Sequence, residues 1–214
     1  MKFIDLQKEV KRRLSIFQDN TFYTEEMIKN WINIANKWAC AYKPWPFTEK
    51  AKYTLSVANQ EEYDYPEEFM SDSIRILKVD GEIYEKVRYE DYFRLKNDIF
   101  FKDKIFTDFN RIIFIYPVIS VSGKEILIFG QEMPRDLIND TDETPFAYNE
   151  EEGEEAIIKY ALKIALQRGG FYDRATIEGE EARLILENIW GRISGEQSTY
   201  LSKSSQYFKD IQFF

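Results

Sequence analysis

Histidine is absent from this sequence of 214 residues, and cysteine occurs only once. Histidine is the usual general base near neutral pH and the commonest zinc ligand. Its absence excludes nucleophilic sites built on a Ser–His or Cys–His pair and most zinc hydrolase sites, whereas reactions that need only carboxylates stay open. The single cysteine, Cys40, allows no internal disulfide, which fits folding in a reducing compartment. Its place in an apolar helical run predicts a packed core thiol.

The sequence also lacks any run of about 18 consecutive apolar residues, so we expect no membrane span. Its first residues alternate charged and apolar types, unlike the continuous apolar stretch of a secretory signal. The net charge of −9 does not favour binding to nucleic acid through the phosphates. Electrostatic repulsion would still suit a surface along which DNA slides. Aromatic residues make up 16% of the chain, which favours an aromatic core or contact with other proteins.

Helical periodicity marks the first part of the chain. Apolar residues at helical spacing predict a helix over residues 3–17. Thr24 is a candidate N-cap for a second helix, which Pro44 and Pro46 should end. The apolar stripe expected on that second helix consists of Met27, Trp31, Ile34, Ala35 and Trp38.

The pattern changes to that of β-strands from about residue 50. Residues 53–57 alternate apolar and polar types, which predicts a strand. Two further strand-like segments flank Asp80-Gly81, a strong signal for a two-residue hairpin turn. Pro117 should end the strand within residues 111–121 or place that strand at an edge. About six short strands are expected, enough for a small sandwich or a barrel-like sheet.

Helical periodicity returns after residues 130–155, a boundary region crowded with acidic residues. One helix should end at Gly169-Gly170, and another should run from about residue 172 to 191. Residues 192–214 are polar but carry large apolar side chains. Because such a tail cannot build a core of its own, its aromatic residues should pack on the body or on another chain.

These patterns predict an α+β fold. We expect a helical bundle, made of an N-terminal helix pair and C-terminal helices, with an inserted antiparallel β domain and an extended C-terminal tail. The expected boundaries give the bundle residues 1–48 and 146–192, the β domain residues 49–145, and the tail residues 193–214.

No motif assembles a catalytic, cofactor or metal site. The acidic run over residues 150–155 is typical of a solvated helix start, where neighbouring side chains point in different directions. A calcium loop is not indicated, because the spacing of its ligands does not match Asp136, Asp140 and Asp142. A phosphate-binding loop is not indicated either, because Gly169-Gly170 lacks the glycine spacing of such loops. Because no nucleophile, base and oxyanion donor come together, we expect a structural protein and not an enzyme.

A longer pattern runs through most of residues 20–190. It resembles the head-to-tail connector (adaptor) proteins of tailed bacteriophages, which form a ring beneath the portal. The order of the segments carries the resemblance, because each motif alone is common. One departure is Tyr65, which replaces the usual leucine before the proline of a Tyr-x-x-Pro-x-x-Phe-like segment. The matching segments are Trp45-Pro46-Phe47, residues 53–57, residues 60–69, the hairpin over 74–87, residues 89–93, the strand ending at Pro117, residues 126–129, 139–145, 154–166 and 173–189.

The resemblance implies a virion protein without a cofactor, assembled in the cytoplasm of the infected bacterium and located in the neck. Its implied partners are the portal ring, a downstream tail or neck protein, and copies of itself in a ring that is usually dodecameric. Double-stranded DNA would pass through the ring without sequence-specific binding, and residues 136–155 would face either this channel or a neighbouring subunit. In such proteins the C-terminal tail commonly docks on the portal. The expected portal-contacting residues here are Tyr200, Tyr207, Phe208, Ile211, Phe213 and Phe214.

Three alternatives remain at this stage. The chain could be another neck ring, such as a stopper or tail-completion protein, although these are usually smaller and mostly β. It could be a carboxylate- and metal-dependent enzyme, such as a nuclease or glycosidase. It could also be a soluble regulator that binds a partner through its tail.

Overall fold

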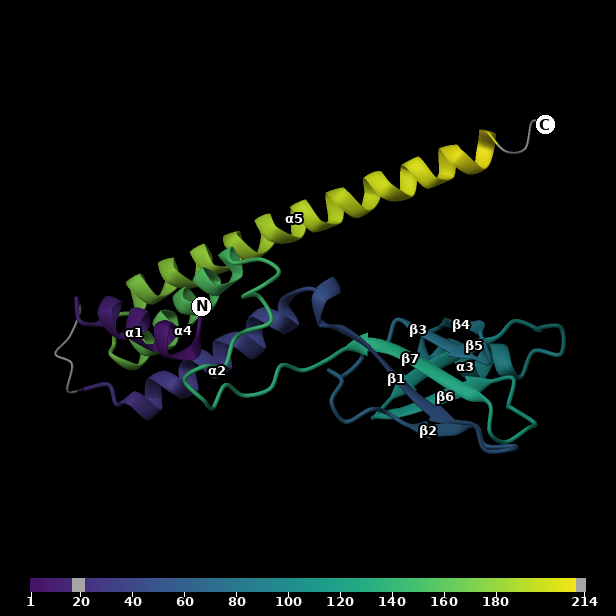
Figure 1. The fold of residues 1–214 in the computed structure, drawn as a ribbon. Helices are drawn as coiled ribbons and strands as arrows, with labels where there is room; N and C mark the ends of the chain where they lie inside the picture. Colours follow the sequence, from purple (N-terminus) through teal and green to yellow (C-terminus); the bar gives the residue numbers. More distant parts are fainter. Residues whose placement is uncertain (17–21, 211–214) are drawn as a thin grey trace. The chain divides into compact units, whose positions relative to one another are not determined.

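The computed structural model describes the backbone of residues 1–16 and 22–210 and the side chains of residues 1–16 and 22–195. The chain forms two compact units (Figure 1). The helical unit comprises Met1–Lys43 and Pro134–Phe214, and the β unit comprises Pro44–Met133. The predicted α+β class is confirmed, since a β unit is inserted into a helical one.

The first two helices of the helical unit are α1 (Phe3–Leu14) and α2 (Glu25–Tyr42). The residues of α1 that recur at helical spacing are buried, as predicted: Phe3, Leu6, Val10 and Leu14. Thr24 caps α2, since its hydroxyl accepts a hydrogen bond from the backbone N–H of Met27 at 3.2 Å.

The buried stripe of α2 differs in part from the predicted one. Trp31 and Ala35 are buried as expected, but Ile34 is 43% exposed, so its prediction as a core residue was wrong. Ile28 and Ile32 are buried on the same side as Trp31. Several residues of α2 are apolar, and the sequence alone did not fix which of two overlapping stripes faces the core.

Helices α4 (Glu152–Arg168) and α5 (Tyr172–Asp210) form a hairpin that completes the helical unit. Gly170 has a φ of +82°, a conformation that glycine adopts without strain, and the predicted helix stop is confirmed. Small residues line both buried faces, which lets the two helices pack closely. The buried residues at this hairpin include Ala156, Ala161 and Ala165 of α4 and Ala175, Ala182 and Leu186 of α5.

The segment before α4 belongs to the helical unit, although the sequence had placed residues up to 145 in the β domain. The backbone N–H of Phe3 donates to the carbonyl of Asp142 at 2.7 Å. The side chain of Asn33 exchanges two hydrogen bonds with the backbone of Leu137. These contacts come from residues far apart in sequence, so local composition did not reveal them.

The β unit is built on one seven-stranded sheet with the strand order β1-β7-β3-β4-β5-β6-β2. Strands β4 and β5 pair in parallel, and the other neighbours pair antiparallel. A short 3-10 turn, η1 (Pro46–Thr48), precedes the sheet, and helix α3 (Tyr89–Lys96) follows β4. The strands are β1 (Glu49–Leu55), β2 (Glu62–Asp64), β3 (Ile76–Val79), β4 (Glu82–Lys86), β5 (Ile105–Phe109), β6 (Ile112–Tyr116) and β7 (Glu125–Gln131).

Two local predictions for the β unit are confirmed. Asp80 and Gly81 have φ values of 53° and 84°, which is the geometry of a tight hairpin turn between β3 and β4. Strand β6 ends at Tyr116, immediately before Pro117, because proline has no N–H to donate to the ladder. The core of the unit is formed by inward-facing residues that include Leu77, Val79, Tyr84, Phe106, Ile113, Ile115, Ile126 and Ile128.

Candidate functional site: the C-terminal arm and its anchor

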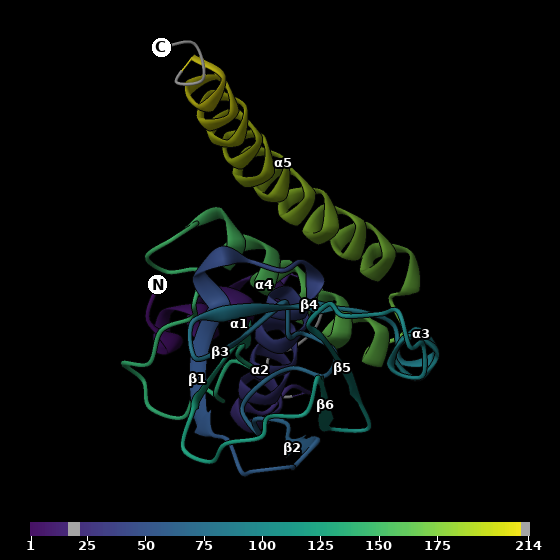
Figure 2. The same cartoon turned by 90° about the vertical axis from the view of Figure 1, so that its right-hand side faces the viewer.

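Helix α5 is far longer than its partner in the hairpin. It has 39 residues, against 17 in α4. Arg192 pairs with Glu150 at 2.8 Å and with Glu152 at 3.1 Å, so α5 is level with the start of α4 at this residue. The helix continues to Asp210, which at ~1.5 Å per residue adds about 27 Å beyond the hairpin. We call residues 193–210 the C-terminal arm; Figure 2 shows it running past the other helices of its unit.

The arm differs in secondary structure from the sequence prediction. An extended tail was expected after a helix that ends near residue 191, and the chain does run on past the bundle, but its backbone stays helical to Asp210. The arm contains no proline and only one glycine, Gly195, so nothing in it stops a helix that already exists. Its many serines, which suggested a separate tail, are not helix breakers.

The predicted portal-contacting residues fall on this arm or after it. Tyr200, Tyr207 and Phe208 lie on the helical backbone of the arm, but their side chains are outside the described residues. Ile211, Phe213 and Phe214 lie outside the described residues altogether. Their role as contact residues therefore stays a prediction.

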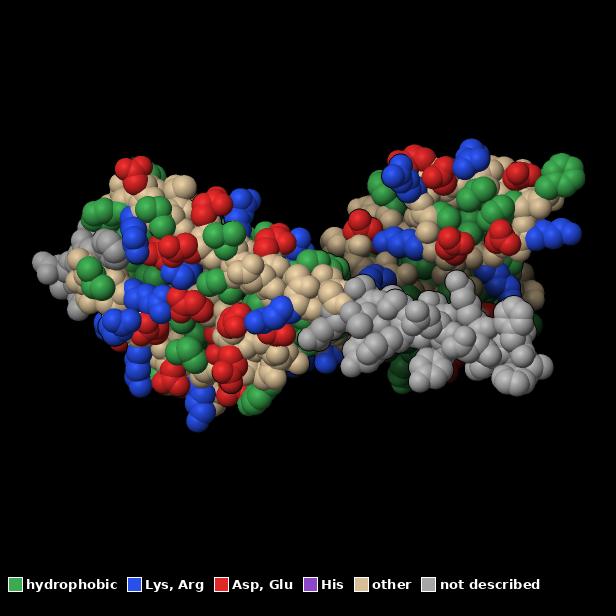
Figure 3. Space-filling view, turned by 90° about the horizontal axis from the view of Figure 1, so that it is seen from above, with side chains coloured by type: hydrophobic (Ala, Val, Ile, Leu, Met, Phe, Trp, Pro, Cys, Tyr) green, Lys and Arg blue, Asp and Glu red, His purple; other side chains and the backbone are tan. Residues whose placement is uncertain are grey.

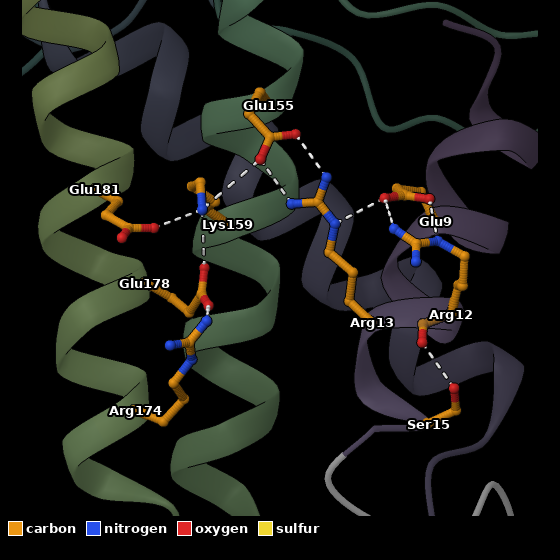
Figure 4. A network of polar contacts seen from close by, with 9 residues as sticks. All are labelled: Glu9, Arg12, Arg13, Ser15, Glu155, Lys159, Arg174, Glu178 and Glu181. Atoms are coloured by element: carbon orange, nitrogen blue, oxygen red, sulfur yellow. Dashed lines mark hydrogen bonds and ion pairs between the residues drawn. The ribbon is translucent and has the colours of Figure 1, made fainter.

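A network of ion pairs anchors α5 to α4 (Figure 4). Lys159 of α4 lies 2.6 Å from Glu181 and 3.2 Å from Glu178, both on α5. Glu178 is almost fully buried and also pairs with Arg174 at 2.7 Å. Burial by itself lowers the pKa of Lys159, but the hydrogen bonds and charges of Glu181 and Glu178 outweigh it and raise the pKa. The lysine therefore stays charged and holds two turns of α5 against α4.

The same network reaches α1. Arg13 donates two hydrogen bonds to Glu155 of α4, at 2.6 and 2.9 Å, and a third to Glu9 at 2.7 Å. Hydrogen bonds from Arg12 and Arg13 lower the pKa of Glu9 to about 2. A carboxylate held in this way is a poor proton acceptor at neutral pH. The network therefore has the character of a structural clamp between α1, α4 and α5.

The acidic segment 136–155 is tied down by individual partners. Asp136 pairs with Lys37 at 2.7 Å. Asp142 accepts hydrogen bonds from the backbone N–H groups of Ile138 and Asn139, which lower its pKa. No group of three or more acidic or cysteine side chains within the described residues could hold a metal ion. Figure 3 shows acidic and basic side chains interspersed over the helical unit, on the left.

The β unit contains a second buried ion pair. Lys86 lies 2.7 Å from Asp108, whose side chain is almost fully buried, and 2.9 Å from Asp72. Burial raises the pKa of Asp108, while Lys86 opposes this effect. The pair borders a hollow of about 680 Å³, whose wall also carries Arg75, Arg88 and Glu90. The side chains that line this hollow are charged, but none of them is an activated nucleophile. The ion pair of Lys86 and Asp108 links strand β4 to strand β5.

The structure also exposes apolar residues of the β unit that the sequence analysis had not singled out as a surface. Ile99 and Phe100, in the loop before β5, are 91% and 89% exposed. Tyr53 and Leu55 on β1 and Ile83 on β4 are more than half exposed. The alternation of Tyr53 and Leu55 with polar residues was a usable signal, but it did not say which side of the strand faces the core.

None of the helices in the described part of the chain combines the length and apolar character needed to cross a membrane. The arm is thus a helix of mixed polarity that projects from an ion-paired hairpin. Comparison with models of protein families and with curated proteins finds no match for the chain.

Proposed function

We propose that this chain is a structural ring subunit of a tailed-phage neck, the head-to-tail adaptor that joins the portal to the tail. The observation that carries the proposal is the C-terminal arm, about 27 Å of helix beyond the hairpin that holds it. An arm of this kind reaches a neighbouring protein without displacing the body from which it projects.

The construction of the helical unit supports the arm's role. Lys159, Glu178 and Glu181 fix α5 against α4, and Arg192 fixes the last turn before the arm begins. Because these ion pairs hold the base of the arm, a pull on the arm acts on the whole bundle. This is the mechanical requirement for a subunit that joins two parts of a particle.

Two further observations agree with an adaptor. The sequence pattern resembles that family over most of residues 20–190, and the architecture that the family implies, a helical bundle with an inserted β domain, is the architecture of this chain. The net charge of −9 suits a ring through which DNA passes, because repulsion of the phosphates prevents sticking.

The test is reconstitution with the portal protein of the same phage. Full-length protein mixed with portal rings should add a ring of density to the tail-proximal face of the portal in electron micrographs. If the portal stays bare while circular dichroism shows that the protein is folded, the proposal is wrong.

A truncation locates the contact. Deleting residues 197–214 should abolish binding to the portal while the melting temperature of the remaining chain stays close to that of the full protein. A matched control replaces Ser204 and Ser205 with alanine, which keeps the arm helical and should leave binding intact. Unchanged binding by the truncated chain would show that the arm is not the portal contact.

A further inference from the structure

The loop between α3 and β5 presents two apolar side chains to solvent. Ile99 and Phe100 are 91% and 89% exposed. The loop is nevertheless ordered by its own contacts: the carboxylate of Asp98 accepts a hydrogen bond from the backbone N–H of Phe100 at 2.9 Å, and the ring of Phe101 stacks on Tyr116. We call Ile99 and Phe100 the apolar tip. A fixed turn that exposes two large apolar residues side by side is unusual in the absence of a partner.

The same unit carries a second apolar surface on its sheet. Strand register places Tyr53 opposite Leu127, Leu127 opposite Lys78, and Lys78 opposite Ile83, so these four form one row across β1, β7, β3 and β4. A neighbouring row contains Ala51, Phe129 and Ile76. The alternate residues on these strands, such as Leu77, Ile126 and Ile128, point the other way into the core.

We call this surface the outer face. Its most exposed members are Tyr53 at 75%, Leu55 at 58% and Ile83 at 64%. Lys78 is the one charged residue in the row of Tyr53. Its ammonium lies 5.6 Å from the centre of the Phe129 ring, so its aliphatic stem runs along the apolar surface. The outer face comprises Ala51, Tyr53, Leu55, Ile76, Lys78, Ile83, Leu127 and Phe129. The exposed carboxylates of Glu85 on β4 and Glu125 on β7 lie on the same side of the sheet.

Each surface carries a charge of opposite sign beside it. Lys102 is exposed two residues after the tip, and Glu125 is exposed at the start of β7, directly opposite Leu55. Among the residues that the structure describes, neither of these two charged side chains has an ion-pair partner, whereas Lys96 at the end of α3 and Lys104 in the loop are paired. The tip is therefore apolar with an exposed cation beside it, and the β1–β7 side of the outer face is apolar with an exposed anion.

We propose that the apolar tip of one copy of this chain docks on the outer face of the β unit of a second copy, with Lys102 facing Glu125. The occupant is a second copy because one chain carries both halves, which are apolar and bear charges of opposite sign. The inference rests on the proposed function, in which copies of the chain form a ring. Lys102 lines one hollow with Ile76 and Ile83, so the loop that carries the tip adjoins the β4 end of the outer face on the same chain. We infer a head-to-tail contact, in which each copy gives its tip to the next, because this type can close into the ring of the proposed function.

Disulfide trapping tests the contact. One batch of full-length protein carries Phe100→Cys and another carries Leu55→Cys; the native Cys40 is fully buried and should not react. Mixed and oxidised, the two batches should give a 55–100 heterodimer well in excess of 55–55 and 100–100 pairs, both in solution and on portal rings. The 2:1:1 ratio that random collision of the two batches would give, or a smaller share of heterodimer, would overturn the proposal.

Paired variants test the direction of the contact. The tip variant (Ile99→Ser with Phe100→Ser) and the face variant (Tyr53→Ser with Leu55→Ser) should each self-associate about thirtyfold more weakly or worse in sedimentation velocity. Their 1:1 mixture retains one intact tip and one intact face, so it should form dimers and nothing larger. The control, Ile138→Ser, alters a residue of the helical unit that is 74% exposed and should change nothing. A mixture that stays monomeric contradicts the proposal.

Charge reversal gives an independent readout. Lys102→Glu and Glu125→Lys should each reduce the 55–100 cross-link, and the two together in one chain should restore it. If the portal binds this protein but the cross-link never forms, the proposed contact fails and the adaptor function stands. If the cross-link forms while the portal stays bare, the self-contact stands and the adaptor function fails.

Discussion

Two glycine-to-alanine substitutions in helices should change stability in opposite directions. A Cβ atom at Gly153, the second residue of α4, would lie 2.1 Å from Cδ1 of Phe146, which is fully buried. A Cβ atom at Gly191 of α5 would meet nothing within 4 Å. The two substitutions therefore add the same methyl group, at Gly153 into an occupied site and at Gly191 into open space.

The magnitudes follow from two terms. Replacing glycine by alanine inside a helix stabilises by up to about 1 kcal/mol, and Gly191→Ala should gain most of this. At Gly153 the gain is smaller because the residue lies in the first turn, and forcing the Phe146 ring to move costs roughly 1–3 kcal/mol. We expect Gly153→Ala to destabilise by about 2 kcal/mol in net terms. With a few degrees per kcal/mol for a chain of this size, its melting temperature should fall by about 6 °C.

Urea unfolding followed by circular dichroism measures both variants. The double variant Gly153→Ala with Phe146→Leu should recover part of the loss, because the smaller side chain leaves room for the methyl group. A Gly153→Ala protein as stable as the parent would show that the Phe146 ring does not pack on the start of α4.

Three further perturbations test the helical unit. Lys159→Met should destabilise by about 2 kcal/mol in urea unfolding, because Glu178 stays buried with only one cationic partner, Arg174; a parent-like midpoint would show that the network contributes nothing. The depressed pKa of Glu9 stabilises the fold above about pH 4.5, and this contribution is lost as the pH falls toward 2. Glu9→Gln should therefore cost about 1 kcal/mol at pH 7, after allowance for solvent screening, and almost nothing near pH 2; a cost independent of pH contradicts this reasoning. Trp38→Ala removes a ring stacked on Tyr160 at 3.8 Å and should cost about 2 kcal/mol, whereas Trp38→Phe should keep most of it.

The elements that the sequence predicted well depend on local physics. The buried stripe of α1, the cap at Thr24, the turn at Asp80-Gly81 and the end of β6 before Pro117 each follow from a few adjacent residues. Each also has one dominant cause, such as a missing N–H or a positive φ. Such causes act the same way in any fold.

The elements that it predicted poorly depend on contacts between distant segments. On α5, Ala182 and Leu186 are buried, whereas Ile177 and Leu184, which are as apolar, are exposed. The sequence of one helix does not say which of its apolar residues will face α4. The limit of the β unit near residue 133 depends on hydrogen bonds between residues 134–151 and the first two helices. The apolar surface of the β unit went unrecognised because an alternating strand pattern does not say which side is covered.

The candidate site, too, has parts that adjacent residues predict and parts that depend on residues far apart in the sequence. The resemblance pointed to the C-terminal region, and the helical arm occupies that region. The ion pairs that hold its base join α4 or the segment before it to α5 over 19 to 42 positions, and the same network extends to Arg13 and Glu155, which are 142 positions apart. No periodicity in the sequence indicates such a pair. The end of α4, by contrast, was predictable from the adjacent residues Gly169 and Gly170.

The pairing of β1 with β7 bears on how the chain folds. The chain enters the β unit beside Thr48 and leaves it beside Glu132, whose backbone N–H donates to the carbonyl of Thr48 at 2.9 Å. While residues 44–133 are unfolded, bringing α2 to the segment that begins at Pro134 means closing a loop of roughly 90 residues. Once the sheet has formed, the same closure spans only a few residues, which lowers its entropic cost by about 2.5 kcal/mol. A β unit that folds early thus acts as a staple for the bundle, and assembly of the helices should accelerate as soon as β1 and β7 have met.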